Sequence, residues 1–462
     1  MRLPPDYSLK LCENIAAWRY EQLPPATVKT VKRIILDALG VIGGAARAPG
    51  IRELNERLAR WETNGTATGL IGKRRYSPPS AALANGAAAH ALDFDDIHDA
   101  SRVHSACVVL PALLATAEDA GPRSGKAFIA AMAIGLELHA RLGLACINSL
   151  AMGWHPTPVF GALAASVAAG HLLNLDAERL RNALGIAFHQ TSGSIQSAFD
   201  GVLTKRLGPG FAARDAVTSA FLAADGITGT RAPLEGKAGF FHLYARGDVQ
   251  PELLTDELGD LWRIDEFSFK PYPGCRCSHA AIALGIKLHD EGVSAAAVES
   301  IEIRMSEENW KLVGAPFDVT RGSEVHAQFN AAYSFARALT DGSVVLASYE
   351  RPAINDLHVA AVAAKTRVIT DPCMESNAIA PVAISLQMRD GQIHRRHGET
   401  IKGSPAEPMS DLDMLHKLRG CLAFGLEAPS SVADRFAETI FSLDDAADVG
   451  AAITAVFPTA LN

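Results

Sequence analysis

Apolar residues recur every three or four positions through the first two-thirds of the chain, which predicts helices. The segment 28–39 follows this spacing directly after Pro24-Pro25, and proline suits the first turn of a helix. Strand patterns are scarce before residue 265. Further stretches of this kind, rich in alanine and other small residues, run over 80–92, 110–117, 125–144, 159–172, 177–187 and 212–224. This part of the chain therefore predicts helices that pack closely against one another.

The pattern changes after residue 265. Apolar and polar residues alternate over 298–305, which is typical of a strand. A second alternation over 384–388 runs into Asp390-Gly391, a dipeptide that favours a hairpin turn. With a helical stretch between these strand patterns, the segment 266–403 predicts a smaller α+β domain.

The helical pattern returns after Pro408, where Ser410 and Asp413 have the spacing of a capping box. Turn residues at 403–405 separate it from the preceding strands. We therefore predict a mainly α fold in which both chain ends build one large all-helical domain. The predicted ranges are 1–265 with 404–462 for the helical domain and 266–403 for the α+β domain.

The composition describes an ordinary globular protein. A chain of 462 residues is long enough for two domains, and 48% hydrophobic with 20% charged residues is a usual balance. The net charge of −8 argues against nucleic acid or a membrane surface as a partner. The longest apolar run, 127–136, is too short to span a bilayer, and the N-terminus has no signal layout. Together with seven scattered cysteines, these features predict a cytoplasmic protein with reduced thiols.

A cluster of carboxylates and imidazoles is the first candidate site. Stretches of small and apolar residues flank it on both sides, and charges held beside a core must be paired, bound to a metal or used in chemistry. The cluster comprises Asp93, Asp95, Asp96, His98, Asp99 and His104. An enzyme is the leading interpretation, and the alternative is a helix end with capping and structural hydrogen bonds. On a helix, Asp93 and Asp96 would share a face, but the spacings do not match those of common metal sites, so we expect no metal.

His155 is the second candidate, in the segment Trp154-His155-Pro156-Thr157-Pro158. The prolines stiffen this turn and end any helix before it. A histidine held in a rigid turn before a helix is well placed for acid–base chemistry. The alternative is a histidine with an ordinary structural role.

Two cations, Lys205 and Arg206, precede the glycine-rich segment 208–210, which we expect to be a turn that opens a helix carrying Arg214. Free N–H groups at a helix start, with cations beside them, can hold a carboxylate or a phosphate. A dinucleotide site is rejected because no apolar strand precedes the glycines. The alternative is a solvated basic turn.

A stiff loop with two prolines and a glycine covers 270–277 at the predicted domain junction, and His279 begins the next helix. Domain junctions commonly hold active sites, although such a loop can be only a connector. Cys275 is a weak candidate for a nucleophile. Tyr333, taken alone, reads as a core residue.

The order and spacing of these segments resemble the MmgE/PrpD family, which includes 2-methylcitrate dehydratase, cis-aconitate decarboxylase and iminodisuccinate epimerase. The resemblance covers nearly the whole chain. The matching segments are 91–96, His104-Ser105, 153–156, 204–207, 270–273 with His279, and Gln328-Phe329 with Tyr333. It implies a large helical domain, a smaller α+β lid, a homodimer, a small polycarboxylate substrate, and neither a metal nor an organic cofactor.

The resemblance also implies roles for individual residues. The active-site pattern of the decarboxylase carries over to Asp93, His104, His155, Lys205, His279 and Tyr333. It implies that His104 and His155 act as base and acid, that Asp93 orients one of them, and that His279 and Tyr333 complete the pocket from the lid side. Lys205 would bind a substrate carboxylate, with Arg206, Arg214 and Lys270 as further substrate-binding candidates. This chain departs from the decarboxylase pattern at Ile97, where that pattern has threonine, and at Ser105-Ala106, where it has Pro-Ser.

The activities of the family share one step, the chemistry of a carbon next to a carboxylate. Removing a proton from such a carbon needs a positioned base and cations that hold the developing charge, and histidine, with an ordinary pKa of about 6.5, suits the base. The favoured activity is that of a hydro-lyase of the 2-methylcitrate dehydratase type. Epimerisation and decarboxylation stay open as alternatives, as do a metal hydrolase and a non-catalytic ligand-binding relative. The last would be expected to lose the histidines, which this chain keeps.

Overall fold

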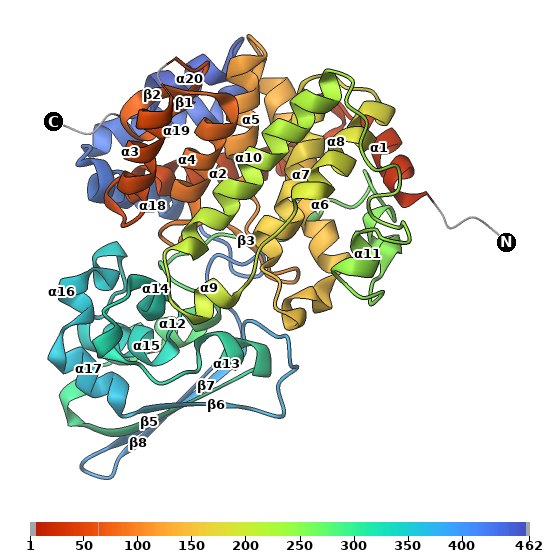
Figure 1. Ribbon diagram of the computed structural model, residues 1–462. Coiled ribbons are helices and arrows are strands. Elements are labelled where there is room, and N and C mark those ends of the chain that lie inside the picture. The colour runs from red at the N-terminus through yellow and green to blue at the C-terminus, as the bar shows by residue number, and fades with distance from the viewer. Residues whose placement is uncertain (1–5, 63, 459–462) are drawn as a thin grey trace.

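The computed structural model describes residues 6–62 and 64–458, and this part of the chain is mainly α-helical, as predicted. Most of its helices form one large body, which also carries both described chain ends (Figure 1). The helices of this body are α1 (Tyr7–Ala17), α2 (Pro25–Gly44), α3 (Ile51–Trp61), α4 (Pro78–His90), α5 (Ala106–Asp119), α6 (Gly125–Ala145), α7 (Pro156–Leu172), α8 (Ala177–Gln190), α9 (Gln196–Phe199), α10 (Thr204–Ala224), α11 (Phe240–Leu243), α18 (Asp411–Leu426), α19 (Ser430–Phe441) and α20 (Val449–Val456).

A smaller α+β part, which we call the lid, lies at the other end of the molecule (Figure 1). Its helices are α12 (His279–Asp290), α13 (Glu307–Val313), α14 (Glu324–Gln328), α15 (Ala331–Asp341), α16 (Arg351–Ile354) and α17 (Leu357–Ala364). Its strands are β5 (Val298–Met305), β6 (Thr366–Thr370), β7 (Val382–Met388) and β8 (Ile393–Gly398).

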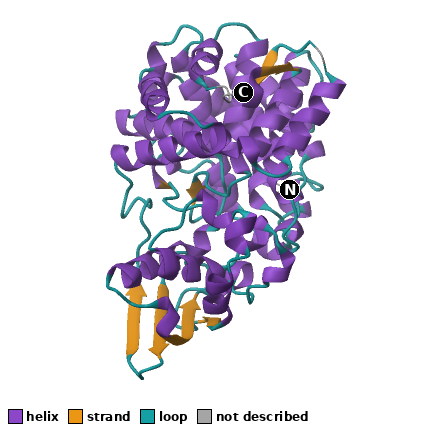
Figure 2. Cartoon of the chain, turned by 90° about the vertical axis from the view of Figure 1, so that its left-hand side faces the viewer, coloured by secondary structure: helices purple, strands orange, loops and turns teal. Residues whose placement is uncertain are grey.

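The strands of the lid form one sheet in the order β6-β5-β7-β8, with β5 and β6 parallel and the other pairs antiparallel. β7 and β8 form the hairpin predicted around Asp390-Gly391. Helices α12, α15 and α17 contact the sheet, and Figure 2 shows helices between the sheet and the helical body. The sheet therefore lies at the far end of the molecule and the lid helices lie nearer the body.

Two hydrophobic cores stabilise the two parts. The core of the body contains residues up to Phe269 and again from Met409 onward, so distant segments of the chain pack together in it. The core of the lid runs from Cys275 to Ile401. The short segments between these residues, 270–274 and 402–408, connect the cores, and the first of them leads directly into the site described below.

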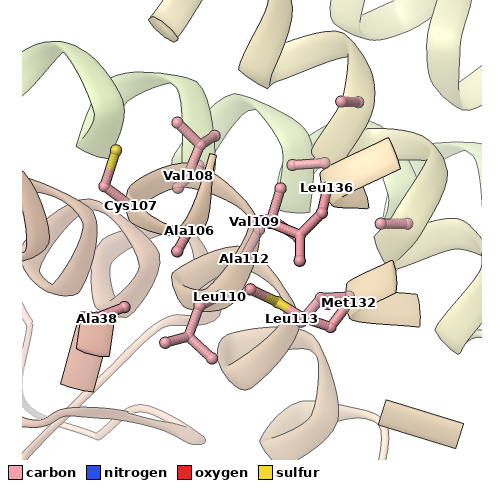
Figure 3. Packing of buried hydrophobic residues seen from close by; sticks show 14 of the residues in the cluster. Ala38, Ala106, Cys107, Val108, Val109, Leu110, Ala112, Leu113, Met132 and Leu136 are labelled. Atoms are coloured by element: carbon pink, nitrogen blue, oxygen red, sulfur yellow. The ribbon is translucent and has the colours of Figure 1, made fainter. Parts of the chain in front are cut away.

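Apolar side chains of α5 and α6 pack together in the core of the body. Val108, Val109 and Leu113 of α5 pack against Met132 and Leu136 of α6 in the centre of the body (Figure 3). α6 is long and apolar enough to cross a membrane by length and composition, yet 89% of its most apolar stretch is buried inside the protein. Core helices of globular proteins share these properties.

The glycine-rich turn predicted at 208–210 is wrong, because this segment lies inside α10. A Cβ atom on Gly210 would lie 2.4 Å from the backbone oxygen of Leu83 in α4, so glycine is needed for the two helices to touch. Pro209 removes one backbone hydrogen bond from the helix, the one its N–H would have given to the carbonyl of Lys205. The glycines therefore serve helix packing, and the helix starts earlier, at Thr204.

Two short antiparallel sheets in the body show that it is not all-helical. One pairs β1 (Ala67–Gly69) with β2 (Arg74–Tyr76), and the other pairs β3 (Ile97–His98) with β4 (Phe267–Ser268). Strands of two or three residues are too short to give an alternating pattern, which is why the sequence did not predict them. The acidic cluster does not lie on a helix, so Asp93 and Asp96 do not share a helix face as the sequence analysis considered. α4 ends at His90, and the cluster follows in a loop.

Candidate active site

Several of the predicted site residues line one small cavity between the body and the lid. The body contributes Asp93, His104, His155 and Lys205, and the loop before α12 contributes part of the opposite wall. The cavity volume is about 60 Å³, far below the roughly 300 Å³ of small ligand pockets. Binding a polycarboxylate in this cavity therefore requires its walls to move apart.

Asp93 is the charged centre of this cavity, and two lysines hold it. Lys205, in the first turn of α10, donates to Oδ2, and Lys270 donates to Oδ1 at 2.6 Å and to the backbone oxygen of Asp93 at 2.8 Å. Asp93 has a φ of +50°, a left-handed conformation that turns the chain directly after α4. Burial alone would raise the pKa of Asp93, but the two ammonium groups outweigh it and hold that pKa well below its usual range. Asp93 is therefore an anion shared by two cations.

His104 has a defined tautomer. Its Nδ1 lies 2.7 Å from the backbone oxygen of Asp96, and a carbonyl oxygen only accepts, so Nδ1 carries the proton. Nε2 is left with a lone pair and has no hydrogen-bond partner in the described part of the chain. Burial, opposed by the Asp95 carboxylate, lowers the pKa of His104 to about 3. His104 is therefore a neutral imidazole that can accept a proton at Nε2.

His155 is the N-cap residue of α7, and its backbone N–H donates to the oxygen of Gly193 at 3.1 Å. Pro156 and Pro158 follow it in the first turn of the helix and fix its position. The ring of His155 makes no hydrogen bond within residues 6–62 and 64–458. Burial and the nearby Lys205 ammonium hold the pKa of His155 well below its ordinary value. The cavity thus contains a second neutral imidazole with free nitrogens.

A third imidazole, His90, stands behind these two and was missed by the sequence analysis. Its ring centre lies 5.0 Å from that of His104 and 6.0 Å from that of His155. Its Nδ1 lies 2.7 Å from Oδ2 of Asp95, which itself is fully buried. His90 ends α4 among alanines, and the sequence gives no signal that distinguishes it from a structural histidine.

One group in the described chain brings three possible metal ligands together, with ligand atoms within 4.8 Å of one another: His90, Asp95 and Cys107. Two of these groups already bond each other, and the Cys107 thiol donates to the oxygen of His104 at 3.3 Å. Burial and the neighbouring carboxylates raise the pKa of Cys107 well above its ordinary value, whereas a metal would need the thiolate. The hydrogen bond between His90 and Asp95 and the protonated thiol of Cys107 therefore do not favour a metal here, although Nε2 of His90 and Oδ1 of Asp95 have no partner in the described residues.

Asp96 has the structural role, helix capping, that the sequence analysis gave as the alternative to catalysis for this cluster. Its carboxylate accepts from the backbone N–H groups of Ser105 and Ala106 at 3.2 Å, and so caps the start of α5. Burial and the nearby Asp95 and Asp37 raise the pKa of Asp96 to about 8, although these backbone bonds oppose the shift. Two carboxyl groups of the same cluster therefore differ in role, because Asp93 lines the cavity and Asp96 caps a helix.

His279 and Tyr333 lie in the lid and do not line the cavity. Nε2 of His279 is 3.4 Å from the oxygen of Gly274, and burial lowers the pKa of His279 well below its ordinary value. The hydroxyl of Tyr333 donates to the oxygen of Ser348 at 2.5 Å, inside the core of the lid. In this structure both side chains therefore lie outside the lining of the cavity.

Arg206 and Arg214 also lie away from the cavity. Arg206 bonds Glu324 at 2.8 Å and the oxygen of Pro49 at 2.9 Å, and so ties α10 to α14 of the lid. Arg214 is partly exposed and pairs with the adjacent Asp215. Of the four substrate-binding candidates, only Lys205 lines the cavity, while Lys270 reaches Asp93 from behind.

The lid wall of the cavity contains residues that the sequence analysis did not select. Arg276 and Cys277 line it with Cys275, and Arg102 lines the cavity from the body, in the loop between β3 and α5. Gln328 joins the two parts by donating to the oxygen of Leu92 at 3.0 Å. Isoleucine, leucine and phenylalanine side chains form the rest of the wall. Arg102 could have been noticed in the sequence, because it is a cation two residues before His104. Nothing in the sequence indicates which side chains of the lid loops face the cavity.

A second, larger cavity of about 420 Å³ lies behind Phe94, between α18 and the loop Pro271–Pro273. Its walls are mostly apolar, and neither Asp93 nor the histidines of the site line it. We therefore place the chemistry in the smaller cavity, where charged and titratable groups converge.

Comparison with known protein families places this arrangement in context. The model of the MmgE/PrpD N-terminal domain matches residues 9–252, and that of the MmgE/PrpD C-terminal domain matches residues 272–440. The chain belongs to the MmgE/PrpD family. The resemblance inferred from the sequence is therefore confirmed, and the second match spans the lid together with α18 and most of α19.

Curated relatives in this family are enzymes. The chain is 28% identical to the cis-aconitate decarboxylase-like protein oryM of Aspergillus oryzae over 96% of each chain. It is 27% identical to cis-aconitate decarboxylase of Aspergillus terreus, over 95% of this chain and 94% of that protein. It is also 29% identical to the human cis-aconitate decarboxylase, over 86% of this chain and 84% of the human one. The chain thus belongs to a family of the decarboxylase or dehydratase type.

Proposed function

We propose that this chain is a lyase that acts, without a cofactor, at the carbon next to a carboxylate of a small di- or tricarboxylate. One observation carries the proposal: two neutral imidazoles, His104 and His155, line the same buried cavity as a lysine. A neutral imidazole can take a proton from carbon, and a buried ammonium group can hold the negative charge that then develops on the carboxylate.

The first candidate reaction is the elimination of water, as in a hydro-lyase. One histidine would take the proton from the carbon next to the carboxylate, and the electron pair of that C–H bond would form the C=C bond. The negative charge of the bound substrate would raise the pKa of the other histidine, which would then take up a proton and donate it to the departing oxygen as the C–O bond to the neighbouring hydroxyl breaks. The pair of imidazoles in one cavity supports this reaction, because it uses a base and an acid in the same turnover.

The second candidate reaction is decarboxylation, and the names of the relatives favour it. Here the C–C bond to one carboxylate breaks, CO₂ leaves, and a protonated histidine donates to the carbon that keeps the electron pair. The apolar part of the cavity wall, with Ile97 and Phe329, would favour loss of charge from the departing carboxylate.

Incubation with di- and tricarboxylates in D₂O, followed by NMR, tests the proposal and separates the candidates. Elimination gives an unsaturated acid and water, decarboxylation gives CO₂ and a product with deuterium on carbon, and epimerisation gives exchange with inversion. We expect one of the first two outcomes. If no polycarboxylate exchanges a proton or breaks down with the intact protein, the proposed function is wrong.

The pH dependence follows from the burial of the histidines. A base must be unprotonated, and burial lowers the pKa of His104 to about 3. The value of kcat/KM, which reports the free enzyme, should therefore show no acidic limb near about pH 6.5. A bound polycarboxylate adds negative charge and raises the pKa of both imidazoles, so the acidic limb of kcat should lie at higher pH than that of kcat/KM. Measured pH profiles of both parameters check this order, and a limb of kcat/KM near about pH 6.5 would contradict it.

A further inference from the structure

Arg102 is a buried cation in the cavity wall that no carboxylate of the described residues neutralises. It stands in the loop between β3 and α5, its φ is +56°, and it is 9% exposed. Its guanidinium donates to the backbone oxygen of Asn377 at 2.8 Å and lies 3.8 Å from Sγ of Cys277, both in the lid. It forms no ion pair in residues 6–62 and 64–458.

The other buried cations around the site differ from Arg102 in this respect. Lys205 and Lys270 share Asp93, and Arg276 pairs with Asp99 at 3.1 Å. Removing a charge from water without an opposite charge nearby is strongly unfavourable. The partners of Arg102, a carbonyl and a thiol, satisfy only part of the five N–H donors of a guanidinium.

Cys277 supplies only partial compensation. A hydrogen bond from Cys275 and the nearby Arg102 lower the pKa of the Cys277 thiol. At 3.8 Å the sulfur also leaves the guanidinium free to turn toward a stronger acceptor. A carboxylate, which accepts two N–H bonds side by side, is the acceptor that fits a guanidinium best.

The cavity therefore has two centres of positive charge. Lys205 and Lys270 share the single carboxylate of Asp93, and the Asp95 carboxylate next to His90 is the other buried anion nearby. Arg102 adds a positive charge on the lid side that has no carboxylate partner in the described residues. His104 and His155 line the same space. Building on the function proposed above, we propose that Arg102 binds the second carboxylate of the substrate while Lys205 binds the first, so that the enzyme selects diacids over monoacids.

A carboxylate bound at Arg102 would also link the body to the lid. Since its guanidinium already contacts Asn377 and Cys277 of the lid, a carboxylate bound there would join the body, the substrate and the lid in one network. A monoacid held at Lys205 alone would leave the charge of Arg102 unmatched.

Binding of unreactive acids by calorimetry tests the inference on the full-length protein. The probes are succinate, glutarate and tricarballylate, with butyrate as the monoacid, and the variants are Arg102→Gln and Arg102→Lys. The control is Arg179→Gln, which changes an exposed arginine on α8. A charge-assisted hydrogen bond implies that Arg102→Gln raises the Kd of the best diacid by about 10- to 100-fold, while the Kd of butyrate stays within about twofold. Arg102→Lys should lie between, and the control should match the wild type.

The outcomes separate this inference from the proposed function. Equal losses for diacid and monoacid in Arg102→Gln, or no loss for either, overturn the role of Arg102 even when the wild type converts a polycarboxylate. A wild type that binds none of these acids and exchanges no proton overturns the proposed function, and this inference with it. Thermal unfolding of each variant guards against misfolding. If Arg102→Gln does not fold, the same comparison with Arg102→Lys decides, because a lysine offers no paired donors and should still weaken the diacid selectively.

Discussion

Replacing His104 or His155 with glutamine is expected to lower kcat by about 10²- to 10⁴-fold and to leave the fold intact. Both rings line the cavity with at least one nitrogen that bonds nothing in the described chain, so neither has a structural hydrogen bond at that atom. Glutamine keeps an amide donor that can still reach the backbone oxygen of Asp96, but it cannot exchange a proton. Steady-state kinetics on the substrate found in D₂O measure the loss.

The control is His171→Gln, at the opposite end of the same helix as His155. His171 donates from Nε2 to the oxygen of Trp18 at 3.0 Å, a bond that the glutamine amide can replace. This variant should keep kcat within about twofold of the wild type, as surface and structural substitutions of this kind usually do. Near wild-type rates for both cavity variants would contradict the acid–base assignment, even if the proposed substrate class were right.

The sequence predicted the helices of the body and the hairpin of the lid because these elements repeat a pattern over many residues. The segment 28–39 and the alternation over 384–388 lie in α2 and β7, respectively. Prediction from the sequence failed where a residue type, such as glycine, is common both in turns and at close contacts between helices. Gly210 looked like a turn residue and is instead the point where α10 touches α4, which only a tertiary contact reveals.

The same limit applies to the site. Asp93 and Asp96 are close in sequence and chemically alike, yet one contacts two lysines and the other caps a helix. The environment of Asp93 depends on Lys270, which lies 177 residues further along the chain. Periodicity carries no information on such a contact. Order and spacing along the chain indicated the family, and the matches to both family domains confirmed it.

Asp93→Asn is expected to destabilise the protein by about 3–5 kcal/mol, because it leaves the buried ammonium groups of Lys205 and Lys270 without their shared carboxylate. The low pKa of Asp93 gives the sign of the accompanying pH effect. A carboxylate whose pKa is lower in the folded than in the unfolded protein adds stability above its unfolded pKa, about 3.9, and loses it as pH falls toward the folded value. The variant should therefore lose more unfolding free energy relative to the wild type at neutral pH than under acidic conditions, as urea unfolding at several pH values can measure.

The control for stability is Asp99→Asn, in the same loop. Asp99 is partly exposed, with a relative side-chain exposure of 24%, and its replacement leaves one buried cation, Arg276, which keeps the backbone oxygen of Lys402 as an acceptor. Asp93→Asn leaves two buried cations without their carboxylate, so the loss from Asp99→Asn should be smaller. Equal losses in the two variants would show that Asp93 is an ordinary ion-pair partner.

A double variant separates the stability of this ion cluster from its use in catalysis. Asp93→Asn with Lys270→Met removes one of the two uncompensated cations and places an apolar side chain of similar length at a fully buried position. Replacing buried charges with packed apolar groups is often neutral for stability, so the double variant should recover much of the unfolding free energy that Asp93→Asn loses. Activity should not return, because Lys205 has then lost the carboxylate that positions it in the cavity beside His104 and His155. If activity returned together with stability, Asp93 would act only by neutralising buried lysines, and the orientation of Lys205 toward the substrate would need another cause.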